Sequence, residues 1–142
     1  MIDRADTPLT PVRVDVVVAA PAHSGLGQRL TYGYERPLAP GTLVRVPLGR
    51  RTVLGIVWDC ADGTEAAPAV TPDQIRPIGE VWDALPALSA EWRALVAFAA
   101  RYYQRALGEV ALAALPPALR DANKAQIARR LQRLAPPATA PA

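Results

Sequence analysis

Hydrophobic and polar residues alternate along the first half of the chain, as is typical of half-buried β-strands. In the segment Val12–Val18 every even position is valine, whereas Arg13 and Asp15 fall on the other face. The segment Leu30–Tyr34 alternates in the same way, with Thr31 on the face opposite the large side chains. Both segments are therefore predicted to be strands that bury one face.

The segment Leu43–Trp58 predicts a β-hairpin, because two runs rich in β-branched residues flank a short turn. The turn contains Gly49, Arg50 and Arg51. A hairpin cannot bury its apolar face alone, so the other strands must close a small sheet or barrel around it and leave the tip in solvent. An exposed tip with a positive charge and an accessible backbone suits an anionic partner.

A further strand-like run covers Ile75–Trp82, after a loop predicted over Asp59–Asp73. Pro77 within this run predicts an edge strand or a bulged strand and leaves Arg76 free to project. The chain is thus expected to form five strands, arranged as a small β-meander or a barrel-like sheet.

After Pro86 the hydrophobic period changes from two to about 3.6 residues, which indicates helices. Ser89 is placed to cap the first helix, Gly108 is expected to end it, and a second helical piece is predicted over Glu109–Leu115. The two pieces form a helical hairpin after the sheet, so the predicted fold class is α+β. The stripe expected to pack on the sheet consists of Trp92, Leu95, Val96, Ala99, Tyr102 and Tyr103.

A last helical pattern spans Ala118–Leu134, and a Pro/Ala-rich tail follows it. The pattern has an apolar face for which the sequence offers no evident partner. The predicted organisation is a flexible lead-in over residues 1–11, a β subdomain over residues 12–83, a helical hairpin subdomain over residues 84–120, and a helix with a linker toward an absent downstream domain over residues 121–142.

The net charge of +3 is unevenly distributed along the 142 residues. Residues 87–142 carry eight Lys/Arg against three Asp/Glu, whereas residues 1–86 carry eight against ten. The basic half is compatible with nucleic acid as a partner. No apolar run approaches the roughly 18 residues of a membrane span, and the charged start lacks the apolar core of a secretory signal. A cytoplasmic location is expected.

Motifs for catalysis and for metal binding are not recognised in the sequence. A phosphate-binding loop requires lysine after glycine, but Lys124 is the sole lysine and follows Asn123. His23 lies beside Ser24 without an orienting acid, and a single Cys60 supplies neither a disulfide nor a metal cluster. No catalytic residue, metal or cofactor is therefore expected in this chain.

Several separate motifs occur in one collinear order over about residues 12–120. They include Arg29-Leu30-Thr31-Tyr32, Val44-Arg45-Val46-Pro47-Leu48-Gly49-Arg50, Gly55-Ile56-Val57, Ile75-Arg76-Pro77-Ile78 and Leu107-Gly108-Glu109-Val110. In this order they resemble the N-terminal DNA-binding domain of the primosomal replication-restart helicase PriA. The resemblance implies a non-enzymatic domain that captures the 3′ end of the nascent leading strand at a stalled fork without reading sequence. It also implies, as partners, other primosome proteins and the downstream helicase domains that hold the motor.

The resemblance further implies a site for the 3′ end. A glycine in the hairpin tip lets the backbone approach the terminal sugar, an arginine on the fifth strand binds phosphate, and the second strand supports the base. Well-known members carry an aspartate where this chain has Thr31. Two further arginines at the tip add phosphate contacts that do not depend on sequence. The predicted DNA-binding residues are Leu30, Thr31, Tyr32, Gly49, Arg50, Arg51 and Arg76.

Other readings of the same residues stay open. Tyr32 fits a core position as well as a base platform, and Gly49 fits a turn without any ligand. A function of a different class is a protein-interaction module that docks a partner on the helix face of Trp92 and Tyr102.

Overall fold

The computed structural model describes residues 11–20, 29–59 and 74–135. Predictions for the remaining segments lie outside the described residues: the flexible lead-in, the loops that hold His23 and Cys60, and the Pro/Ala tail. Within the described part the strands precede the helices, which confirms the α+β class. No helix in these ranges is long and apolar enough to cross a membrane.

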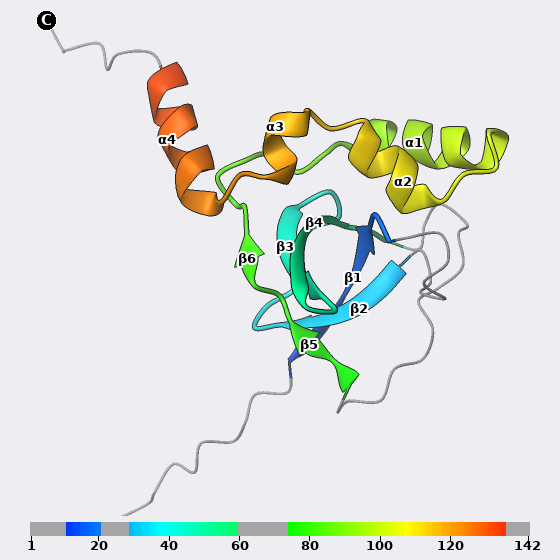
Figure 1. Cartoon of the computed structure of the whole chain (residues 1–142), viewed down its shortest axis with the longest axis horizontal. Coiled ribbons are helices and arrows are strands. Elements are labelled where there is room, and N and C mark those ends of the chain that lie inside the picture. The colour runs from blue at the N-terminus through cyan, green and yellow to red at the C-terminus, as the bar shows by residue number, and fades with distance from the viewer. Residues whose placement is uncertain (1–10, 21–28, 60–73, 136–142) are drawn as a thin grey trace, which may run out of the picture.

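The strands form one curled sheet in the order β5-β2-β1-β4-β3-β6 (Figure 1). The barrel-like arrangement is confirmed, but the meander order is wrong because β1 lies between β2 and β4. Gly55 permits this pairing, since a Cβ at its position would lie 2.5 Å from Val16 Cγ1 on β1. The strands are β1 (Val12–Val18), β2 (Arg29–Tyr34), β3 (Leu43–Leu48), β4 (Arg51–Val57), β5 (Arg76–Pro77) and β6 (Glu80–Val81).

The predicted fifth strand is divided into β5 and β6, which lie at opposite ends of the strand order. The two residues between them carry the chain from one edge to the other. The Ile78 N–H donates to Gly33 O at 3.0 Å, and the Gly79 N–H donates to Arg45 O at 2.9 Å. This segment, residues 76–81, therefore closes the curled sheet; we call it the closing segment.

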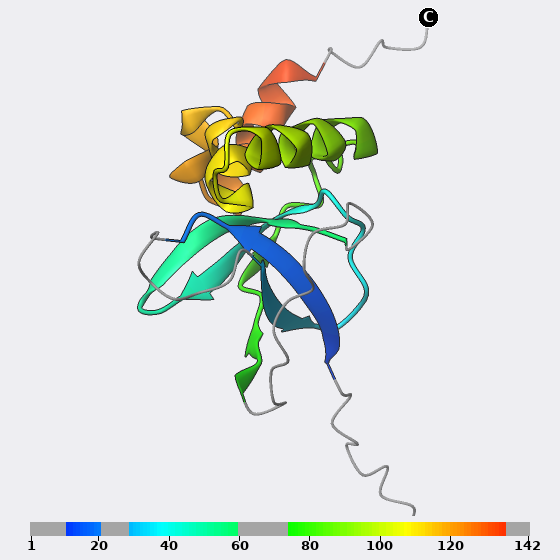
Figure 2. The ribbon, with the colours of Figure 1, turned by 90° about the vertical axis from the view of Figure 1, so that its right-hand side faces the viewer.

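The sheet separates two hydrophobic cores. The inner core lies within the curl, and the outer core lies between the sheet and the helices that cover one side of it (Figure 2). Adjacent residues serve different cores, because Val16 is buried in the inner one and Val17 in the outer one. Trp58 and Trp82 are buried in the outer core, and Trp92 packs against it.

The first two helices depart from the prediction at their junction. Ser89 caps α1 as expected, since its Oγ accepts from the Trp92 N–H at 3.1 Å. However, α1 ends near Gln104, which has a φ of 52°. Gly108 lies inside α2, where a Cβ would stand 1.8 Å from Val18 O, so this glycine allows the helix to touch the end of β1. The helices are α1 (Ala90–Tyr102), α2 (Leu107–Ala113), α3 (Pro117–Arg120) and α4 (Lys124–Leu134).

The last helical pattern is also divided, into α3 and α4, because Asn123 caps a new helix. Its Oδ1 accepts from the Gln126 N–H at 2.9 Å, while Gln126 Oε1 accepts from the Asn123 N–H at 3.0 Å. Ile127 is buried and Leu131 packs against the outer core, although Leu134 is 80% exposed. Most of the apolar face of this region is thus covered by the chain itself.

The predicted stripe on α1 packs only in part. Trp92 and Val96 contact the outer core, with Ala97 and Ala100 buried beside them. The small side chains of Ala97 and Ala100 let the backbone of α1 approach the core closely, and several large side chains of the helix turn outward. Three predicted stripe residues are therefore exposed: Leu95, Tyr102 and Tyr103.

Candidate functional site

The β3–β4 hairpin ends in the two-residue loop Gly49-Arg50, closed by the pair Leu48 and Arg51. Gly49 has a φ of 61°, whereas Arg50 is not among the residues with positive φ, a combination typical of a type II′ turn. Glycine is favoured here by the backbone conformation. Nothing lies within 4 Å of the position that its Cβ would take, so the backbone of the tip is open to an approaching ligand.

Arg76 reaches this tip from the closing segment. The parallel pairing of β5 with β2 places Arg76 beside Tyr32. Its Nη1 donates to Gly49 O at 3.0 Å in an exposed hydrogen bond. Three segments far apart in the sequence, namely β2, the hairpin tip and β5, therefore meet at one place.

Tyr32 forms the base of this arrangement. Its ring is buried in the inner core, and its hydroxyl donates to Pro47 O at 2.7 Å. Burial raises the pKa of the Tyr32 hydroxyl above 10.0, and the nearby charge of Arg76 partly opposes this shift. The phenol therefore stays neutral at ordinary pH and ties β2 to the end of β3.

Thr31 lies on the other face of β2 from Tyr32. Its hydroxyl donates to Asp15 Oδ1 at 2.8 Å, across the directly opposed pair that the two residues form in β1 and β2. The hydrogen bond that Thr31 makes therefore leads away from Gly49 and Arg76. Asp15 was not among the predicted site residues; its antiparallel pairing with Thr31 is the signal that identifies it.

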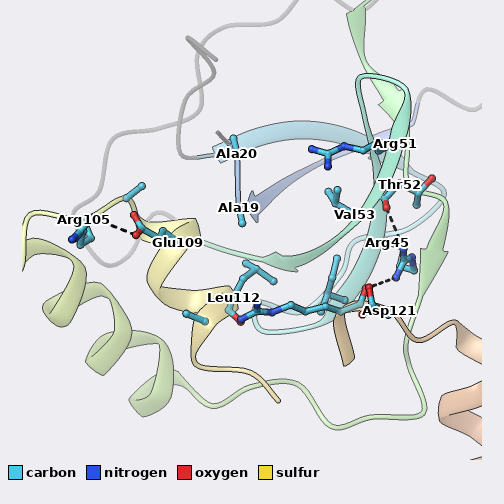
Figure 3. Close-up of a pocket in the computed structure, with 14 residues that line it drawn as sticks. Ala19, Ala20, Arg45, Arg51, Thr52, Val53, Arg105, Glu109, Leu112 and Asp121 are labelled. Atoms are coloured by element: carbon cyan, nitrogen blue, oxygen red, sulfur yellow. Dashed lines mark hydrogen bonds and ion pairs between the residues drawn. The ribbon is translucent and has the colours of Figure 1, made fainter. Parts of the chain in front are cut away.

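The remaining predicted residues are spread around the hairpin. Leu30 packs partly buried against the inner core, and Arg50 is exposed at the tip. Arg51 lines a groove between the hairpin and the helices, which Figure 3 shows. The structure thus brings together Tyr32, Gly49 and Arg76.

The chemistry available at this place is hydrogen bonding and positive charge. One N–H of the Arg76 guanidinium is used by Gly49 O, and a guanidinium carries several further donors that suit a phosphate. In the described ranges, no group of three or more His, Cys, Asp or Glu side chains is placed to hold a metal ion. Such an arrangement can bind an anionic chain whose end lies against the open tip.

Comparison with protein-family models gives a match to PriA's 3′DNA-binding domain (3′BD) over residues 15–116. The matched range contains the second half of β1, the other five strands, α1 and α2. It also contains the hairpin tip and Arg76.

Proposed function

The chain belongs to the family of PriA 3′DNA-binding domains, and from this membership we propose that it captures the 3′ end of the nascent leading strand at stalled replication forks. The family makes DNA the partner. The finer proposal is that the strand end lies at Gly49 and Arg76 and is bound without reading base sequence. The observation that carries it is the hydrogen bond from Arg76 to the open backbone of Gly49.

Each group at the tip has a separate role in this proposal. The open space over Gly49 lets the terminal sugar approach the backbone. Arg76 binds a phosphate through the donors that Gly49 O leaves available. The buried ring of Tyr32, with Leu30 beside it on the same face, supports the strand end from below. Arg50 and Arg51 add phosphate contacts that do not depend on sequence.

Thr31 contributes to the proposed site together with Asp15, to which its hydroxyl donates a hydrogen bond. The resemblance implies an aspartate at this position, and here the carboxylate of Asp15 lies 2.8 Å from the Thr31 hydroxyl. Because the Thr31 hydroxyl donates its hydrogen to Asp15, the pair presents acceptor oxygens from both side chains and can accept hydrogen bonds from the N–H donors of a base. We place it at the flank of the site, on the face of β2 that does not carry Tyr32.

The test compares primed forks that end in a 3′-hydroxyl or in a 3′-phosphate. The hydroxyl end is expected to bind more tightly, because a site shaped around the terminal sugar has no place for an added phosphate. Arg76→Ala is expected to weaken binding and to lower the slope of log affinity against log salt by about one contact, roughly 0.7 to 0.9. Affinity is measured by fluorescence anisotropy at several salt concentrations.

Arg130→Ala is the matched control, since Arg130 is an exposed arginine on α4, away from the hairpin. It removes the same charge and is expected to leave the preference for a 3′-hydroxyl unchanged. Equal affinity of the unmodified chain for the two ends contradicts the assignment of the site.

A second function is favoured by the aromatic face of α1. Phe98 and Tyr102 stack with ring centroids 5.9 Å apart, and Tyr102 meets Tyr103 edge to face at 5.0 Å. These rings are more than half exposed and suit docking to a protein, such as another primosome protein or a downstream helicase domain. Salt separates the two functions, because it weakens phosphate binding and leaves apolar docking largely unchanged.

A further inference from the structure

A second basic surface lies on the other side of the hairpin from Arg76. It is an open groove of about 710 Å³ between β3 and β4 on one side and α2 and α3 on the other (Figure 3). Among the described residues that line it, four are arginines and two are carboxylates, so cations are in excess there. The charged residues are Arg45, Arg51, Arg105, Arg120, Glu109 and Asp121.

Two of the arginines are held in place by the backbone. Arg45 donates to Arg120 O and Ala122 O, both at 3.0 Å, and to Thr52 O at 3.1 Å. Arg120 in turn donates to Leu112 O at 3.0 Å. These acceptors are neutral carbonyl groups, so the hydrogen bonds fix the guanidiniums without cancelling their charge.

The other two arginines stand at the rim. Arg51 is exposed on β4, and Arg105 lies before α2 with Glu109 3.6 Å from its Nη1. An exposed pair of this kind contributes little to stability. Both side chains are therefore available for a ligand at little cost to the fold.

The floor of the groove indicates which part of a nucleic acid it accepts. Its apolar lining consists of small and aliphatic side chains, and none of the described residues that line it is aromatic. Bases bound without sequence preference usually stack on aromatic rings, which this groove does not offer. Excess positive charge over a shallow aliphatic floor suits the sugar-phosphate backbone.

We propose that this groove binds DNA phosphates as a second contact beside the Arg76–Gly49 site, an inference that rests on the proposed function. Arg51 follows Gly49 by two residues across the turn, so the backbones of the two residues are at most about 7 Å apart. A strand that ends at Gly49 therefore has further phosphates, its own or those of its template, within reach of the groove.

The test is the double variant Arg51→Gln/Arg105→Gln in the full chain. It removes the two rim cations and leaves Arg45 and Arg120, which hold backbone carbonyls, intact. Arg129→Gln/Arg130→Gln on α4 is the control, because both arginines are exposed and neither lines the groove. Thermal unfolding of both double variants is expected to match that of the unmodified chain.

Binding is measured across a salt series with a single strand and with the same strand annealed to a template, each ending in a 3′-hydroxyl or a 3′-phosphate. The groove variant is expected to bind about tenfold more weakly at low salt, with a salt slope smaller by about 1.4 to 1.8. The ratio of the affinities for the 3′-hydroxyl and the 3′-phosphate ends is expected to stay the same. If affinity falls for both the single strand and the annealed DNA, the groove binds phosphates of the captured strand. If affinity falls for the annealed DNA alone, the groove binds phosphates of the template.

Affinities and slopes equal to those of the α4 control on every DNA overturn the inference. This outcome differs from failure of the proposed function, which appears as the absence of a 3′-hydroxyl preference in the unmodified chain.

Discussion

Tyr32 is the residue at which the fold and the candidate site are joined. Its ring is buried in the inner core, its hydroxyl binds Pro47 O, and its backbone pairs with that of Arg76. A change at this residue therefore alters both the stability of the sheet and the support of the tip.

Tyr32→Phe is expected to lower the free energy of unfolding by about 1 kcal/mol at neutral pH, because the hydrogen bond to Pro47 O is lost. The folded protein holds the pKa of Tyr32 above 10.0, so the unfolded chain ionises first. The stabilisation from the neutral phenol is complete below pH 10.0 and is lost as the pH rises through the folded pKa.

Urea unfolding at neutral and at alkaline pH measures this difference. The gap between Tyr32→Phe and the unmodified chain should narrow at alkaline pH, whereas Tyr103→Phe, which removes an exposed phenol, should show no such change. A constant gap at both pH values contradicts the assignment.

At the residue scale, the sequence predicted those features that depend on neighbouring residues in the chain. Gly49 was predicted at a turn because it lies between two strand-like runs, and its φ of 61° agrees. The partner of Thr31 was not predicted, because Asp15 reaches it only through the pairing of β1 with β2. The role of each residue in DNA binding stays a prediction.

At the scale of elements, close contacts decide where the helices lie. Gly108 was expected to end a helix, yet it sits inside α2 against the carbonyl group of Val18. Similarly, Asn123 starts a helix within a pattern that had predicted one continuous helix. Both departures depend on the packing of the helices against the sheet and on capping, which hydrophobic periodicity alone does not report.

Gly108→Ala tests whether packing against the sheet places α2, because packing and helix propensity predict opposite changes in the free energy of unfolding. Helix propensity alone predicts that alanine stabilises α2 by about 1 kcal/mol. The contact with Val18 O instead predicts a net loss of about 1 to 3 kcal/mol, because α2 must move away from β1. Chemical denaturation followed by far-UV circular dichroism measures the change.

Ala113→Gly, at an exposed position of the same helix, is the reference for propensity. It is expected to destabilise by less than about 1 kcal/mol, because Ala113 is the last residue of α2. A stabilising effect of Gly108→Ala is incompatible with the proposed close approach.

At the scale of the whole molecule, the sheet couples the two cores. The closing segment continues into both, since Val81 is buried in the inner core and the next residue, Trp82, in the outer one. The sequence predicted a barrel-like sheet from five apolar runs. It did not predict the strand order, because periodicity identifies strands and their buried faces but not their neighbours.

Val46→Ala is expected to move the unfolding transition of the outer core although Val46 lies in the inner one. Loss of the buried side chain costs about 2 kcal/mol. Tryptophan emission reports the outer core, because all three tryptophans are buried in it or pack against it. The emission midpoint in urea should fall with an unchanged slope, as it should for Leu112→Ala in the outer core. An unmoved midpoint for Val46→Ala means that the cores unfold independently.

The closing segment also affects whether strands of other protein chains can add to the sheet. A sheet grows by adding strands to its margins, and a long, flat marginal strand is the usual template for aggregation. Here the marginal strands β5 and β6 have two residues each, and β5 contains a proline that cannot donate a backbone hydrogen bond. The domain can therefore keep a β-rich surface beside a nucleic acid while its two outermost strands offer an incoming strand only a short template.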